Sequence, residues 1–270
     1  GMEFTLNTVN IQKRDLRWST TVNLWLNRNK ITHLYRSDLD EDGIEDDDIG
    51  NRWFIGHPIT AIYDYTLNGV FQEGEEMPNN IFKPGYYRIV DINDDNGVPD
   101  DDGFIDPINP NDRSIIGKKE ADFSLGLLNK FQYKGFDLSF FINSRFGGMK
   151  NNADLNPAAQ FVVRRNSIVK HYWTPENKSN SWPVINYPNP YGHGFYGDLT
   201  YIRLQDVTLS YNFDNNLIKK LHLEGLSAYI SGKNLYTLTD WKGWDPEREI
   251  YTSSDFPLIK SWVLGINVSF

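Results

Sequence analysis

The sequence predicts an all-β protein, namely an antiparallel transmembrane β-barrel portion of about nine strands with long extracellular loops. Long segments alternate between apolar and polar residues, which is the period of a strand with two different faces. Short turns alternate with long loops, as in outer-membrane barrels. No run of 18 or more apolar residues occurs, so the sequence excludes membrane-spanning helices.

The first two strands are predicted at residues 3–13 and 16–30, joined by a tight turn near Arg14 and Asp15. In the second segment, large apolar and polar side chains take opposite faces over about 11 residues, the length of a tilted membrane strand. An acidic loop at 37–52 follows. Further strands are predicted at 59–71, 85–92, 123–133, 136–146, 199–213, 225–239 and 258–270.

The end of the chain carries the strongest strand signal. Trp262, Leu264, Ile266, Val268 and Phe270 fall on one face, and mostly small or polar residues fall on the other. A soluble protein seldom leaves such an apolar strand at an edge, whereas a membrane barrel turns its apolar face to lipid. The residues expected to face lipid are Phe123, Leu125, Leu127, Leu138, Phe140, Leu264, Ile266 and Val268.

Charge is distributed unevenly along the chain. The net charge is -9, and residues 38–112 hold 20 of the 36 acidic residues but only three basic ones, Arg52, Lys83 and Arg88. This block would repel phosphates, so no nucleic acid partner is expected. The absence of cysteine excludes disulfides, thiolate metal sites and a cysteine nucleophile. Strand pattern begins directly after Gly1 and Met2, so we expect a part of a longer protein.

Several short motifs occur in a characteristic order. They are Asp112–Gly117, Tyr133–Ser139, Tyr172–Asn177, Tyr201–Tyr211, Ser231–Tyr236, Trp244–Glu247 and the terminal Phe270. Together they resemble the C-terminal part of SusC/RagA-type TonB-dependent outer-membrane transporters, and the resemblance covers most of residues 55–270. Residues 1–270 would then be the C-terminal portion of the receptor β-barrel, without the plug domain.

This resemblance implies a full barrel of about 22 strands located in the cell outer membrane, in contact with its lipid. It also implies a plug domain, the TonB complex acting through the missing N-terminal part, and a SusD-like surface lipoprotein. The implied function is outer-membrane uptake of glycans or peptides. The alternative is a soluble, secreted carbohydrate-binding β-sandwich with calcium-stabilised loops; strands of about 5 to 7 residues would indicate it.

Two acidic loops are candidate calcium sites, and no other cofactor is expected. In the first, Asp38, Asp40, Asp42, Ile44 and Asp46 fall at positions 1, 3, 5, 7 and 9 of a calcium-binding loop. Ile49 stands where the bidentate Glu of position 12 is expected. In the second, the candidates at positions 1, 3, 5 and 12 are Asp91, Asn93, Asp95 and Asp102. The alternative for both segments is a solvated acidic surface loop.

Aromatic residues in two loops are candidate substrate-binding residues. They are Tyr187, Tyr191, Phe195, Tyr196, Trp241 and Trp244. Flat rings of this kind stack on sugars or contact a partner protein, and the alternative is packing within the loop or an interfacial girdle. The five histidines have no metal-ligand spacing, and neither a nucleophile motif nor a nucleotide-binding loop occurs. The sequence therefore predicts no enzyme.

Overall fold

The computed structural model describes residues 1–39, 41–92, 108–158, 168–220, 222–243, 245–247 and 258–270. The chain divides into two compact units. We call Gly1–Arg28, Ala121–Gly148 and Asp198–Phe270 the sheet unit, and Asn29–Glu120 and Met149–Gly197 the loop unit.

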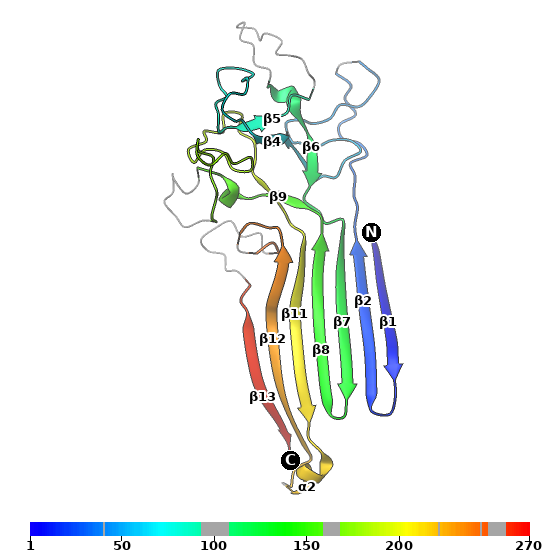
Figure 1. Cartoon of the computed structure of the whole chain (residues 1–270). Coiled ribbons are helices and arrows are strands. Elements are labelled where there is room, and N and C mark those ends of the chain that lie inside the picture. Colours follow the sequence, from blue (N-terminus) through cyan, green and yellow to red (C-terminus); the bar gives the residue numbers. More distant parts are fainter. Residues whose placement is uncertain (40, 93–107, 159–167, 221, 244, 248–257) are drawn as a thin grey trace. The chain divides into compact units, whose positions relative to one another are not determined.

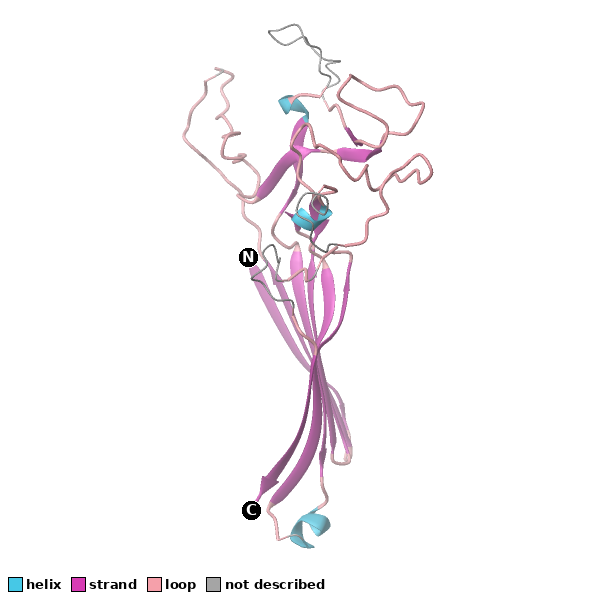
Figure 2. Ribbon diagram, turned by 90° about the vertical axis from the view of Figure 1, so that its left-hand side faces the viewer, coloured by secondary structure: helices cyan, strands magenta, loops and turns pink. Residues whose placement is uncertain are grey.

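The sheet unit is one antiparallel sheet of seven strands, which Figure 2 shows as a single twisted layer. Its order in Figure 1 is β1 (Met2–Gln12), β2 (Leu16–Leu26), β7 (Phe123–Tyr133), β8 (Phe136–Phe146), β11 (Tyr201–Asn212), β12 (Gly225–Thr239) and β13 (Ser261–Ser269). These strands have 9 to 15 residues. A membrane strand needs about 9–11 residues and an ordinary strand has about 5–6, so the lengths favour a barrel over a sandwich.

The short connections of the sheet all join strands at the same end. β1 and β2 are joined across Lys13–Asp15, and β7 and β8 by the two-residue turn Lys134–Gly135. Lys134 and Gly135 both have left-handed backbones, with φ of 45° and 84°. Such a turn matches the twist of the flanking strands. The link from β11 to β12 contains the short helix α2 (Asn215–Lys220).

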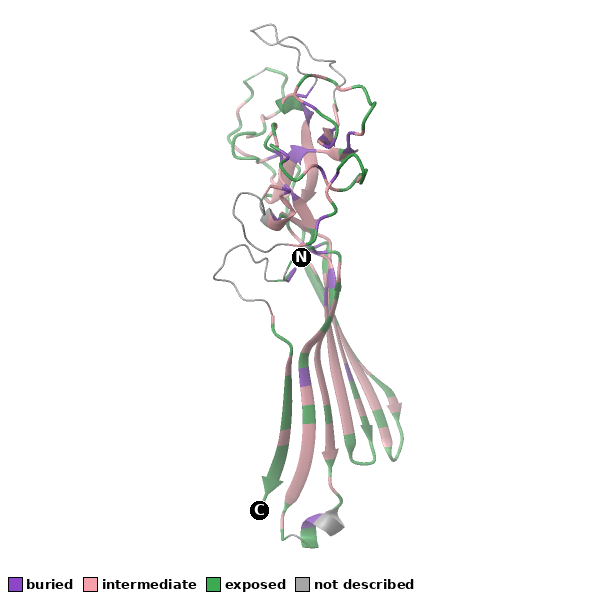
Figure 3. Ribbon diagram, turned by 60° about the vertical axis from the view of Figure 1, so that its left-hand side comes forward, coloured by how far each residue is buried: buried purple, intermediate pink, exposed green. Residues whose placement is uncertain are grey.

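The loop unit consists of small sheets and connecting segments. β3 (Ala61–Tyr65) pairs with β6 (Arg113–Lys118), β4 (Leu67–Val70) with β5 (Tyr87–Ile89), and β9 (Met149–Asn151) with β10 (Tyr196–Asp198). The 3-10 helices η1 (Pro110–Asp112) and η2 (Ala153–Leu155) complete it. Its two core clusters are rich in aromatic rings. Figure 3 shows its buried residues, whereas most of the sheet is intermediate or exposed.

The all-β, antiparallel prediction is confirmed; where about nine strands were expected, the described residues form seven long strands in the sheet unit and six short strands in the loop unit. The segment 59–71 is not one long strand: it divides at Thr66 into β3 and β4, because each half pairs with a different partner. The strand β6 lies between residues 92 and 123, where no strand was predicted. Among the described residues, no helix has the length and hydropathy needed to cross a membrane.

Candidate functional site

The strand register gives the sheet one continuous apolar face. Leu125 of β7 pairs with Leu24 of β2, and Leu138 of β8 pairs with Leu209 of β11. The row continues through Ile230 to Leu264. The eight residues expected to face lipid all lie on this face: Phe123, Leu125, Leu127, Leu138, Phe140, Leu264, Ile266 and Val268. Leu264 and Ile266 are 78% and 70% exposed, which is costly in water and favourable in lipid.

Aromatic rings occupy both ends of this apolar face. Near the short turns, Trp18 stacks on Phe131 with ring centroids 5.3 Å apart, and Phe136 packs on Tyr211 at 4.5 Å. At the other end, Phe123 stacks on Phe146 at 4.6 Å. An apolar band flanked by two aromatic girdles is the pattern that membrane barrels show at the lipid–water interfaces.

One polar residue within the apolar face has its hydrogen bonds satisfied by its neighbours. Asn129 is 6% exposed, and its side-chain oxygen accepts from the Trp18 indole at 2.9 Å and the Thr20 hydroxyl at 2.7 Å. Asn10 in turn donates to Thr20 at 2.7 Å. Polar groups facing hydrocarbon have to be paired internally, and these cross-strand bonds pair the side-chain oxygen of Asn129.

The opposite face of the sheet is polar. Cross-strand pairs on it join Asn7 to Thr21, Lys130 to Ser139 and Thr208 to Ser231. The Thr208 and Ser231 hydroxyls lie 2.9 Å apart. In a barrel of this kind such a face lines the water-filled or plugged interior.

Arg203 of β11 is the most deeply buried charge on the polar face. Its side chain is 1% exposed and lies 2.7 Å from the carboxylate of Asp245, while its other terminal nitrogen pairs with Glu247. Nε donates to the Thr237 hydroxyl at 3.0 Å, and the guanidinium lies 5.0 Å from the centroid of the Tyr201 ring. A buried guanidinium needs such partners, so these contacts fix the segment after β12 to the polar face.

The aromatic candidates of the loop unit pack on protein rather than standing free. Tyr187 and Phe195 are 2% and 8% exposed and belong to a core cluster. Tyr191 stacks on Phe82 with centroids 5.5 Å apart. These contacts favour the alternative of packing within the loop, and substrate binding by these rings stays a prediction. In the sheet unit Trp241 is 7% exposed, and Trp244 lies outside the described residues.

A buried carboxylate that the sequence did not single out ties the loop unit together. Asp64 of β3 is 6% exposed and accepts three hydrogen bonds. The donors are the backbone N–H groups of Tyr65 and Gly194, each at 2.8 Å, and the hydroxyl of Tyr196 at 2.7 Å. Burial, followed by the bond to Asp64, raises the pKa of Tyr196. No sequence pattern links positions 64 and 196.

His193 lies in the same region with both ring nitrogens engaged. Nδ1 lies 3.0 Å from the carbonyl oxygen of Gly194, so it carries the proton and donates. Nε2 therefore accepts from the Tyr187 hydroxyl, also at 3.0 Å. The His193 side chain is buried, and burial lowers its pKa. Burial likewise raises the pKa of Tyr187, so the pair is neutral at pH 7.

In the first acidic loop the carboxylates accept hydrogen bonds from the loop's own backbone. Asp38 accepts from the N–H groups of Asp42 and Gly43, both at 3.0 Å, and Asp46 accepts from Leu39 at 2.8 Å. No group of three or more potential metal-binding side chains occurs in the part of the chain that the structure describes.

The remaining calcium candidates fall largely outside the described residues. Asp40, Asn93, Asp95 and Asp102 all lie there, and of the second loop's candidates only Asp91 is described. Calcium binding by either loop therefore stays a prediction.

The apolar face, the aromatic girdles and the polar opposite face define the sheet unit as part of the wall of an antiparallel transmembrane β-barrel. No family model matches the chain. The whole chain is 28% identical over 294 residues to TonB-dependent receptor P3 of Formosa agariphila, and 25% identical over 284 residues to TonB-dependent receptor SusC of Bacteroides thetaiotaomicron. It spans 28% and 26% of their respective lengths.

Solved structures with the same fold include the RagAB peptide transporter. That structure matches 99% of this chain, with a TM-score of 0.70 and 21% identity, and this chain covers 29% of its matched chain. The closed-closed state of the RagAB peptide importer also matches, with a TM-score of 0.70. The resemblance drawn from the sequence is confirmed: along its whole length the chain is similar to TonB-dependent receptors, SusC among them, and it shares its fold with the matched part of RagAB. These relatives are receptors and transporters by name, not enzymes.

Proposed function

We propose that this chain is the C-terminal part of the barrel of a SusC-like, TonB-dependent transporter that takes up glycans or peptides across the outer membrane. The observation that carries the proposal is the two-faced sheet of seven long strands, with an apolar face bounded by aromatic rings. Similarity to TonB-dependent receptors along the whole chain supports it.

The chain's role in this proposal is to form a wall and loops rather than to catalyse a reaction. The apolar face contacts lipid and the polar face lines the interior of the barrel. The upstream part of the receptor supplies the plug and the contact with the TonB complex, and a SusD-like lipoprotein assists capture at the cell surface. The soluble β-sandwich is disfavoured, because the sheet strands are long and Leu264 and Ile266 are exposed.

Uptake by the full-length receptor tests this proposal. The receptor and its neighbouring lipoprotein are expressed in cells that lack other large transporters, and labelled maltoheptaose and a labelled tryptic casein digest are offered separately. We expect uptake of one probe, with abolition by a proton uncoupler, because TonB-dependent transport needs an energised membrane. Uptake of neither probe, or uptake that persists with the uncoupler, would contradict the proposal.

A further inference from the structure

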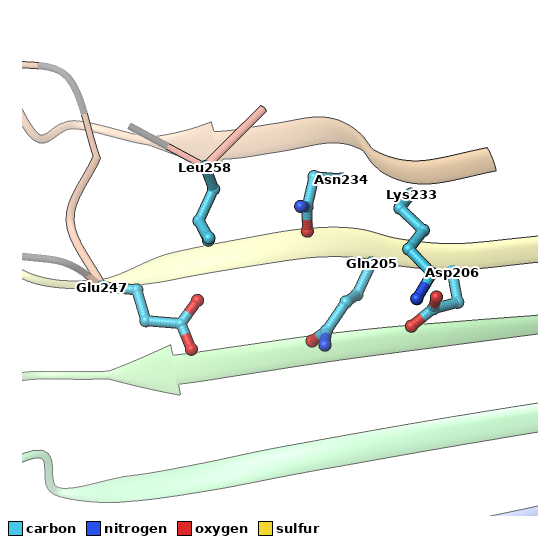
Figure 4. Close-up of a pocket in the computed structure, with 6 residues that line it drawn as sticks. All are labelled: Gln205, Asp206, Lys233, Asn234, Glu247 and Leu258. Carbon is cyan, nitrogen blue, oxygen red and sulfur yellow. The ribbon is translucent and has the colours of Figure 1, made fainter. Parts of the chain in front are cut away.

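A polar cavity of about 460 Å³ lies on the polar face of the sheet, where β11 and β12 meet the segment that follows β12. Its volume is within the range of about 300–1,000 Å³ for small-ligand sites. The lining residues, shown in Figure 4, are Gln205, Asp206, Lys233, Asn234, Glu247 and Leu258.

A β-bulge in both strands creates this concentration of polar side chains. The register passes from the pair Leu204–Tyr236 to the pair Asp206–Lys233, with one residue between them in β11 and two in β12. Within the bulge Asn234 has a left-handed backbone, with φ of 52°. Bulges re-aim side chains and are common beside binding sites. Here polar residues adjacent in sequence line one cavity instead of alternating between the two faces.

Arg203 holds in place an acidic residue of the cavity wall. Its guanidinium holds Asp245 and Glu247 at the polar face, and Glu247 lines the cavity. Arg203 is 1% exposed and is not among the described residues that line this cavity. It is a positioning residue, since without it Glu247 has no other charged partner among the described residues.

The lining side chains indicate the chemistry of a ligand. Asp206 and Lys233 form no ion pair with another described residue, and Figure 4 shows the Lys233 side chain directed toward Asp206. A ligand that carries one positive and one negative group can form an ion pair with each of these two side chains. The amide of Gln205 offers a donor and an acceptor, as a peptide bond requires. None of the described lining residues is aromatic, so the described part of the wall offers charges and amides rather than a ring on which a sugar could stack.

We propose that this cavity is a subsite for a short peptide, with Asp206 and Lys233 binding its charged groups and Arg203 holding Glu247 in the wall. This proposal rests on the proposed transport function and deepens it by choosing peptides over glycans.

The test uses the full-length transporter and the same two probes, the tryptic casein digest and maltoheptaose. The variants are the double substitution Asp206→Asn with Lys233→Met, Arg203→Met, and Arg203→Lys. The control is Arg17→Met, which removes an exposed arginine from the polar face of β2 without touching the cavity. Amounts of folded receptor in the outer membrane are matched by heat-modifiable electrophoretic mobility.

We expect peptide uptake at low concentration to fall at least about tenfold in the double variant, because hydrogen bonds to charged groups are lost. Arg203→Met should show a similar loss, Arg203→Lys should restore part of it, and Arg17→Met should match the wild type. A spin label at position 242, attached to the only cysteine of the full-length transporter, should become more mobile in Arg203→Met and not in Arg17→Met.

Two results would overturn the inference while leaving transport intact. One is uptake of maltoheptaose but not of peptides. The other is peptide uptake unchanged in the double variant, as expected if the upstream part of the receptor fills the cavity. An immobile label in a correctly inserted Arg203→Met receptor would overturn the role given to Arg203.

Discussion

At the residue scale, we expect His193 to make the loop unit sensitive to pH. Burial lowers its pKa, so the folded state favours the neutral ring that accepts from the Tyr187 hydroxyl, while the hydrogen bond to the Gly194 carbonyl and nearby Asp64 act in the opposite direction. The unfolded chain binds a proton at a higher pH than the folded chain. The stability from neutral His193 is therefore fully present above about pH 6.5, the ordinary histidine pKa, and is lost as pH falls toward the lowered folded-state pKa.

We expect hydrogen-exchange protection of residues 187–196 in the full-length receptor to decrease between pH 7.5 and pH 5. His193→Gln should remove most of this dependence, because the amide stays neutral. The control is His57→Gln, which changes an exposed histidine of the same unit. Equal pH dependence in wild type and His193→Gln would show that another group is responsible.

At the element scale, β13 shows how alternation separates the two faces. Ile266 pairs with Ala228 on the apolar face, whereas the Asn267 amide donates to the Ser227 hydroxyl at 3.2 Å on the other. We expect Ile266→Arg to destabilise the full-length barrel by up to about 2–4 kcal/mol, which is the cost of a cation on the lipid face at its maximum, at the bilayer midplane. Asn267→Arg is the matched control and should cost far less. Reversible urea unfolding in lipid vesicles measures both, and equal costs would contradict the assignment of faces.

The acidic loops are the second element with a testable property. If the loops at 38–49 and 91–102 bind calcium, the ion reduces repulsion among their carboxylates. A chelator should then lower the thermal midpoint of the full-length receptor in calorimetry, and Asp40→Ala or Asp95→Ala should abolish that response. Asp137→Ala, in β8 and outside both loops, is the control. The same midpoint with calcium and with chelator would leave only the solvated-loop interpretation.

At the scale of the whole molecule, the sheet has two edges. β1 and β13 each pair with one neighbour among the described strands, so each presents backbone groups without a strand partner. Such edges are prohibitive in hydrocarbon and promote association in water. We therefore expect the 270-residue chain by itself to form no uniform channel and to self-associate. Single-channel recording with the purified chain, against the full-length receptor as control, tests this. Stable conductance from a monomer would contradict it.

The sequence by itself determined the class of fold and the faces of the long strands. Alternation is a local property with a period of two residues, so Leu264 and Ile266 can be assigned to one face without knowing their partners. The predicted strands 123–133 and 136–146 likewise leave only Lys134 and Gly135 between them, so the position of this hairpin turn follows from local signals.

Only the tertiary structure decided how distant segments combine. Arg203 lies 42 positions from Asp245, and Asp64 lies 132 positions from Tyr196. Neither pair can be recognised from a repeating pattern in the sequence, because a buried charge is stabilised by whichever partners the fold brings to it. The bulge at Asp206 and Lys233 likewise depends on the pairing of two strands. The polar cavity therefore follows from strand register, which alternation within one strand does not fix.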